Sequence, residues 1–249
     1  MVVQFEVTPQ GRRIAYQRQQ GAGPGVVFLG GFRSDMTGTK AQHLATWAQG
    51  LGRGFLRLDY SGHGQSGGAF EDGSIGDWVE DAAAVIAAQT TGPQVLVGSS
   101  MGGWIALLLA RAMPERVAAL VGVAAAPDFT DDLIWAGFSA EERARLMAAG
   151  RVETPSEYSA EPYVITRHLI EDGRRHLVLR QPLNLPFAVR LLQGTADVDV
   201  PVSVALRLLD HATGPDMRLV LVKGADHRFS TPDCLALMVE AVEEVLGRV

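Results

Sequence analysis

The residues Val95-Leu-Val-Gly-Ser-Ser-Met-Gly-Gly-Trp104 decide the fold of this chain. Residues typical of a buried strand precede a serine flanked by glycines, and an apolar helical pattern runs on from Trp104 to Ala110. The stretch Gly98 to Gly102 matches G-x-S-x-G, which between a strand and a helix is typical of a nucleophile elbow. The turn is so sharp that Cβ atoms on either side would collide, so glycine is required there. We therefore predict that Ser100 projects its hydroxyl above the edge of a sheet.

Strand and helix patterns alternate on both sides of this turn. A hairpin at Phe5–Val7 and Arg13–Gln17 is expected at one sheet edge. The remaining pattern predicts strands at 25–29, 55–59, 95–98, 117–123, 187–192 and 217–222, with helices at 40–51, 74–89, 104–113, 202–211 and 234–246. This alternation indicates an α/β fold with a mostly parallel, doubly wound sheet. We expect residues 1–249 to form one domain.

The composition narrows the class of protein. The 249 residues carry a net charge of −6 without a cluster of Lys or Arg, which argues against nucleic acid and anionic membranes as partners. Cys234 is the single cysteine, so no disulfide framework is expected. The N-terminal residues do not resemble a signal peptide, and no apolar run is long enough to span a membrane. We expect a cytoplasmic protein without stable membrane association.

The regular pattern breaks between Pro127 and Pro186. A capping-box spacing at Ser139 predicts a helix to about Ala149, and a second helix is expected from Tyr163 to Arg174. We interpret residues 127–186 as a small helical cap over the carboxyl ends of the strands, where such sheets bind ligands. The apolar stretch Phe129–Phe138 would either line an acyl pocket or pack the cap onto the body.

A serine nucleophile needs a base, and the base needs an acid that holds it in the correct tautomer. Among six histidines, His227 is the preferred base because it follows the last predicted strand, at the same edge as Ser100. Asp197, on the loop after the preceding strand, is the preferred acid. We expect Asp199, two residues further on, to point elsewhere or to cap the helix that starts near Pro201.

The negative charge that develops during acyl transfer needs two hydrogen-bond donors. One is the backbone N–H of Met101, which follows the nucleophile. The other is expected from the loop after the strand at residues 25–29, where Phe32 follows Gly30-Gly31. The two glycines allow backbone to approach a substrate closely.

No cofactor or metal is expected. Gly62-His-Gly-Gln-Ser-Gly67 fits the dinucleotide pattern G-x-G-x-x-G, but several residues separate it from the next helix, and no acid follows at a strand end. The histidines and acids show no tight metal-ligand spacing. Cys234 has no histidine partner and is expected to be a buried thiol.

With these residues identified, the chain resembles the α/β-hydrolase superfamily over nearly its whole length. A narrower resemblance, to a mitochondrial group of palmitoyl-protein thioesterases and acyl-glucuronide esterases and its bacterial relatives, lies in Gly31–Ala41, Arg57–Gly62 and Val97–Trp104. The resemblance implies Ser100, Asp197 and His227 as a catalytic triad, a small cap, and an ester or thioester substrate with a long or bulky acyl group. The chain departs from many members at Gly30, where a histidine that braces the loop is common.

The expected activity is therefore hydrolysis of carboxylic esters or acyl thioesters through an acyl-enzyme, on a small molecule or an acylated protein. Hydrolysis of C–C bonds, lactone hydrolysis and cofactor-free haloperoxidase chemistry use the same triad and stay open as alternatives. A non-catalytic ligand-binding protein of the same fold is the third alternative.

Overall fold

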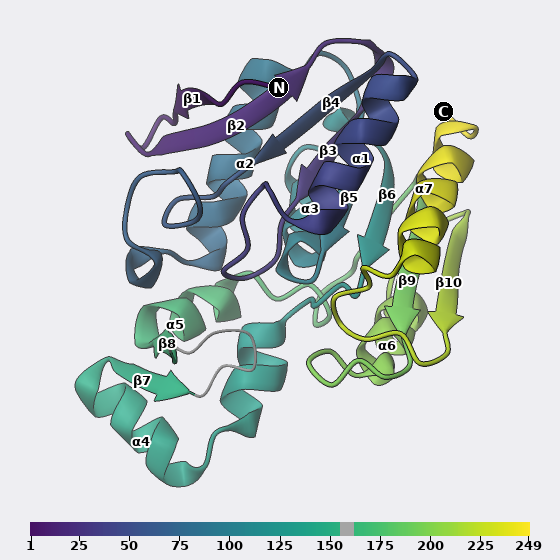
Figure 1. Ribbon diagram of the computed structural model, residues 1–249. Coiled ribbons are helices and arrows are strands. Elements are labelled where there is room, and N and C mark those ends of the chain that lie inside the picture. The colour runs from purple at the N-terminus through teal and green to yellow at the C-terminus, as the bar shows by residue number, and fades with distance from the viewer. Residues whose placement is uncertain (155–161) are drawn as a thin grey trace.

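The computed structural model describes residues 1–154 and 162–249. Its eight-stranded sheet has the order β1-β2-β4-β3-β5-β6-β9-β10 (Figure 1). The strands are β1 (Gln4–Val7), β2 (Arg13–Gln19), β3 (Ala22–Leu29), β4 (Arg53–Leu58), β5 (Gln94–Ser99), β6 (Val117–Val123), β9 (Ala188–Gly194) and β10 (Met217–Val222). Strands β1 and β2 form the predicted antiparallel edge hairpin, and β2 also pairs antiparallel with β4. The strands from β4 to β10 in this order pair in parallel.

Helices cover both faces of the sheet. They are α1 (Thr39–Gly50), α2 (Ile75–Gln89), α3 (Met101–Ala112), α6 (Val202–His211) and α7 (Pro232–Leu246). Helices α1 and α7 pack on one face, in an apolar cluster with the buried Cys234, and the other helices pack on the opposite face, around Trp78 and Trp104. Both tryptophans are fully buried, and each contributes roughly 3 kcal/mol by leaving water. This arrangement, a mostly parallel sheet with helices on both faces, is the α/β-hydrolase fold that the sequence predicts.

The segment between β6 and β9, residues 124–187, is called the β6–β9 segment below. It contains a π-helical stretch (Thr130–Trp135), α4 (Ala140–Ala149), β7 (Arg151–Thr154), β8 (Tyr163–Thr166) and α5 (Arg167–Arg175). Residues 155–161 of the predicted cap lie outside the described residues. In Figure 1 the segment lies beyond the arrowheads of the parallel strands, and Ser100 directly follows the last residue of one of them, β5.

Local capping follows the sequence at two helices. The Ser74 hydroxyl accepts the Asp77 N–H at the start of α2, and Ser139 and Glu142 form a capping box at the start of α4. The prediction of a helix beginning at Tyr163 was wrong. Residues Tyr163–Thr166 pair antiparallel with β7, because Tyr-Val-Ile-Thr is rich in strand-forming side chains and finds a matching partner strand. Thr166 then caps α5, which begins one residue later.

Asp128 joins the beginning and the end of the β6–β9 segment. Its buried carboxylate accepts the backbone N–H groups of Val178 and Leu179 at 2.8 and 3.0 Å, and it pairs with Arg180 at 2.8 Å. Burial raises the pKa of Asp128, although these donors oppose the increase. Within residues 1–154 and 162–249, no helix is long and apolar enough to cross a membrane.

Candidate active site

Ser100 occupies the turn between β5 and α3 with φ of 54° and ψ of −119°. This conformation is uncommon for a residue with a side chain and turns the hydroxyl out of the chain direction. The flanking glycines are sterically required. A Cβ on Gly98 would lie 2.3 Å from the carbonyl oxygen of Gly102, and one on Gly102 would lie 2.1 Å from that of Leu29. The backbone N–H of Ser100 donates to Val123 at 2.9 Å, which fixes the turn against β6.

Ser100, His227 and Asp197 form one hydrogen-bonded line. The Nε2 atom of His227 lies 3.1 Å from Ser100 Oγ, and Nδ1 lies 2.9 Å from Asp197 Oδ2. A carboxylate only accepts hydrogen bonds, so Nδ1 carries the proton and Nε2 is the acceptor for the serine hydroxyl. The three predicted residues therefore meet at the carboxyl edge of the sheet in the order that general-base activation of a serine needs.

Asp197 is held by donors on all sides. Its Oδ2 also accepts from Gln193 Nε2 at 2.9 Å, and its Oδ1 accepts the backbone N–H groups of Asp199 and Val200 at 3.0 and 2.8 Å. Burial alone would raise the pKa of Asp197, but the hydrogen bond from His227 and these further donors hold it below its usual value. The carboxylate is therefore ionised at neutral pH and able to stabilise a protonated His227.

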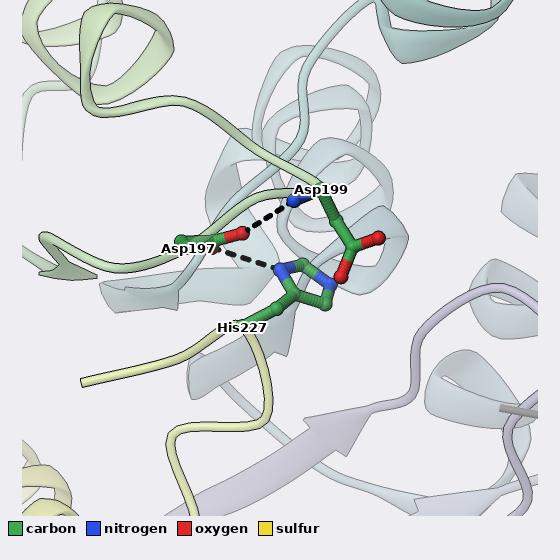
Figure 2. A group of neighbouring side chains, drawn as sticks. All are labelled: Asp197, Asp199 and His227. Atoms are coloured by element: carbon green, nitrogen blue, oxygen red, sulfur yellow. Dashed lines mark hydrogen bonds and ion pairs between the residues drawn. The ribbon is translucent and has the colours of Figure 1, made fainter. Parts of the chain in front are cut away.

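Asp199 lies beside His227, so the expectation that it points elsewhere was wrong (Figure 2). It does not cap α6 either, because the N-cap of that helix is Pro201 and no side-chain bond caps it. The reason is a tight turn after Asp197. The Asp197 carboxylate accepts the backbone N–H groups of Asp199 and Val200, and this brings residue 199 back to the imidazole of His227. Within the described ranges, Asp197, Asp199 and His227 are the one group whose ligand atoms could share a metal ion, all within 4.8 Å of one another.

The predicted oxyanion donors flank Ser100. Met101 is the first residue of α3, and Phe32 lies in the loop of residues 30–36, called the oxyanion loop below. A Cβ on Gly31 would lie 3.4 Å from Ser100 Cβ, so this loop runs directly past Ser100. Among the described residues, the Phe32 N–H has no hydrogen-bond partner. Its ring packs edge-on against four others, those of Phe70, Trp78, Phe129 and Tyr163.

The loop that follows β4 braces the oxyanion loop. His63 Nε2 accepts the Arg33 N–H at 3.2 Å, and Asp59 Oδ1 accepts the Met36 N–H at 2.6 Å. Burial lowers the pKa of His63 to about 4, so the ring is neutral and its Nδ1–H donates to Ser61 O at 3.1 Å. The dinucleotide-like glycine pattern therefore belongs to a supporting loop. His63 supplies a brace where Gly30 has no side chain to do so.

A cavity of about 630 Å³ opens at Ser100 and His227. One side, called the apolar wall, comes from the β6–β9 segment and consists of Phe129, Leu133, Ile134, Phe138 and Ile165. A second group of lining residues, called the polar wall, consists of Arg33, Ser34, Lys40, Asp199 and Arg228. The stretch Phe129–Phe138 thus lines the cavity and also packs the segment onto the body, since Phe129 is part of the core.

The fold and the serine turn define an α/β-hydrolase, and comparison with known proteins agrees. The family described as serine aminopeptidase S33 matches residues 25–170, a range that includes Ser100 and the oxyanion loop. The chain belongs to this family, and it is a hydrolase.

Two curated relatives match nearly the whole chain. The rat protein "Palmitoyl-protein thioesterase ABHD10, mitochondrial" is 34% identical over 247 residues, which cover 98% of this chain and 82% of that one. The human protein of the same name is 34% identical over 236 residues, 94% of this chain and 77% of that one.

Two solved structures superpose closely. A putative hydrolase from Agrobacterium vitis has a TM-score of 0.94 at 44% identity, with 98% of each chain covered. Mouse α/β-hydrolase domain-containing protein 10 has a TM-score of 0.92 at 32% identity, covering 100% of this chain and 99% of that one.

The sequence reasoning did not assign His63, Lys40 or Asp199 to the site. His63 could have been found by the rule that selected His227, because it too follows the carboxyl end of a strand. Lys40 was counted only as the start of a helix, although that helix begins at the same sheet edge. No sequence signal places Asp199, because its position depends on the turn at Asp197.

Proposed function

We propose that this protein is a serine hydrolase that cleaves acyl thioesters or carboxylic esters, with Ser100, His227 and Asp197 as its triad. The observation that carries the proposal is the hydrogen-bonded line from Asp197 through His227 to Ser100, at the mouth of a cavity with an apolar wall. A relative of 34% identity named palmitoyl-protein thioesterase supports an acyl thioester as substrate.

In the proposed mechanism, Ser100 Oγ attacks the acyl carbon while His227 Nε2 takes its proton. The backbone N–H groups of Met101 and Phe32 donate to the oxyanion, each contributing roughly 3 kcal/mol to transition-state stability. The protonated His227, stabilised by Asp197, then donates its proton to the leaving sulfur or oxygen. Water, activated by the same nitrogen, attacks the acyl-enzyme and releases the carboxylic acid.

The apolar wall gives the acyl chain its place. Leu133, Ile134 and Phe138 line the cavity from the β6–β9 segment, which we propose acts as a cap over Ser100. The cavity volume falls in the range of small-molecule sites, roughly 300–1,000 Å³. The side chains of the apolar wall offer no hydrogen-bonding groups, and Glu142, Thr154 and Tyr163 of the same segment add polar atoms elsewhere in the lining. A long or bulky acyl group is therefore the expected substrate, on a small molecule or on an acylated protein. The cytoplasmic location stays a prediction, since the named relatives are mitochondrial proteins.

A fluorophosphonate probe and the Ser100→Ala variant test the chemistry. The probe should label the wild type and fail to label the variant, whose melting temperature should match the wild type. Equal labelling of both proteins would reject Ser100 as the nucleophile.

The substrate is tested by kcat/KM for acyl-CoA, acyl-cysteine peptide and p-nitrophenyl ester series of increasing chain length. We expect Ser100-dependent turnover that rises with chain length. Rapid lactone or C–C bond cleavage, with ester and thioester turnover near background, would instead favour those alternatives. Saturable binding without any turnover would indicate a non-catalytic member of the fold.

A further inference from the structure

Lys40 places an ammonium group in the polar wall of the cavity. It lies in the first turn of α1, is half-buried, and donates from Nζ to the carbonyl oxygen of Arg228. Within residues 1–154 and 162–249, no carboxylate oxygen lies within 4.0 Å of this ammonium. A cation that lines a cavity with a single carbonyl partner retains donors for a ligand.

The position of Lys40 indicates that it faces the leaving group of the substrate and not the acyl group. For His227 to protonate the leaving atom, that atom must lie next to Nε2. Arg228 directly follows His227, so the contact with Lys40 holds the ammonium beside the loop that carries the base, where the leaving atom must lie. The acyl group then belongs along the apolar wall of the β6–β9 segment.

The electrostatic surroundings favour an anion at this place. Burial lowers the pKa of Lys40 to about 8, and the neighbouring Arg228 acts in the same direction, whereas Asp226 and Cys234 oppose it. Arg33 adds a second cation to the polar wall, where its guanidinium lies 5.0 Å from the Phe70 ring and 5.3 Å from the Tyr163 ring.

Two carboxylates also line the cavity. Glu142 projects from the β6–β9 segment and already accepts the Ser139 N–H at 2.8 Å. Asp199 lies beside His227. Because its carboxylate is negative, it would favour a cationic leaving group, which is the alternative to the anionic one.

We propose that Lys40 is the specificity-determining residue of a subsite for an anionic leaving group, one that carries a carboxylate or a phosphate near the scissile bond. The inference rests on the proposed hydrolase function and deepens it by naming the chemistry of the leaving group. The ammonium pairs with the anion of the bound substrate while His227 acts on the neighbouring sulfur or oxygen.

The test uses octanoyl thioesters that share an acyl chain and differ in the charge of the thiol. The thiols are 3-mercaptopropionate for a carboxylate, 2-mercaptoethyl phosphate for a phosphate, N-acetylcysteamine for a neutral group and thiocholine for a cation. In the wild type we expect kcat/KM to be about tenfold higher for at least one anionic thioester than for the neutral one, as one charge-assisted hydrogen bond can provide. Comparison of the two anionic thioesters identifies the preferred anion.

Variants at the two lysines of the chain, Lys40 and Lys223, show which of them is responsible for the preference for an anionic thioester. Lys40→Gln should abolish the anionic-to-neutral ratio and Lys40→Arg should keep most of it. The matched control is Lys223→Gln, because Lys223 is exposed and does not line the cavity. A ratio near one in the wild type, a ratio unchanged by Lys40→Gln, or a preference for the thiocholine ester would each overturn the inference.

A binding measurement keeps the inference testable without turnover. Reductive methylation with ¹³C-formaldehyde labels both lysines and the N-terminus, and the Ser100→Ala variant holds the substrate uncleaved. The Lys40 signal should shift on addition of the preferred anionic thioester and stay in place with the neutral one, while the Lys223 signal is unaffected by both. Equal responses to the charged and neutral thioesters would refute the subsite. Loss of Ser100-dependent turnover alone would count only against the proposed function.

Discussion

The Nε2 atom of His63 accepts the backbone N–H of Arg33 at 3.2 Å, and this bond holds a residue with a left-handed φ of 54° directly after the proposed oxyanion donor Phe32. The brace comes from the loop after β4, not from the oxyanion loop itself. The position of this proposed oxyanion donor therefore depends on a buried histidine that does not line the cavity.

Removal of this brace should lower kcat more than it changes KM. His63→Ala leaves the Arg33 N–H without its acceptor and lets the Phe32 N–H drift, so we expect kcat to fall roughly 10- to 100-fold. His63→Gln, whose amide can accept at a similar place, should recover part of the loss. Steady-state kinetics with one thioester measures both variants. A KM effect alone would show that His63 shapes binding and not the oxyanion site.

The same histidine predicts a pH dependence of stability. The pKa of His63 is about 4 when folded, below its usual 6.5. Below pH 6.5 the unfolded chain therefore binds a proton that the folded chain does not, and the free energy of unfolding falls as the pH drops toward 4, by roughly 3 kcal/mol. Urea unfolding at pH 7 and pH 4.5 measures this loss, and His63→Gln should show a smaller one. An equal loss in both proteins would assign it to other groups.

Asp197 and Asp199 form a matched pair of acids beside one histidine. Asp197→Asn should lower kcat about 10⁴-fold, because the amide favours the wrong tautomer of His227. Asp199→Asn removes the same charge two residues away and should change kcat less than about tenfold, since its side chain does not bond to Nδ1. Kinetics with a neutral thioester compares the two. Similar losses in both variants would show that the two carboxylates share the role of the acid.

The glycines of the serine turn predict a steep stability effect. Gly102→Ala places a Cβ 2.1 Å from the Leu29 carbonyl oxygen, a backbone contact that does not yield easily. We expect a loss of more than about 3 kcal/mol or a failure to fold. Gly50→Ala, at the end of α1 with no atom within 4 Å, is the control and should stay within about 1 kcal/mol of the wild type. Thermal unfolding of both variants decides the matter.

The apolar wall predicts a chain-length effect. Ile134→Trp fills part of the cavity from the β6–β9 segment, so kcat/KM should fall for long acyl chains and change little for short ones. Leu206→Trp, on the exposed side of α6, is the control and should leave the chain-length profile unchanged. A parallel drop at all chain lengths would mean that the acyl group does not lie along this wall.

Much of the fold could be predicted from the sequence, because a buried strand and the serine turn each need particular residue types at a few consecutive positions. Asp197 and His227 could be predicted because the carboxyl ends of parallel strands lie at one edge of the sheet. A residue that directly follows such a strand in the sequence is therefore expected at that edge. The β7–β8 pair was missed because two strands of four residues are stable only against each other, and neither shows a helical or strand period long enough to identify alone. Asp199 and His63 were missed for a similar reason: their positions depend on hydrogen bonds from distant or folded-back backbone.

The bonds at Asp128 have a consequence for how this enzyme can change. The β6–β9 segment leaves the sheet and returns to it at one carboxylate, so the junction is closed independently of what lies between Asp128 and Val178. The β6–β9 segment, which lines the cavity, and the sheet that carries it can then vary separately. We expect the segment to vary with the range of substrates and the sheet with the stability of the fold. We therefore expect the segment to be exchangeable as a module, and a graft that keeps Asp128 and the backbone N–H groups at residues 178 and 179 should carry the proposed acyl preference of its donor into a new host.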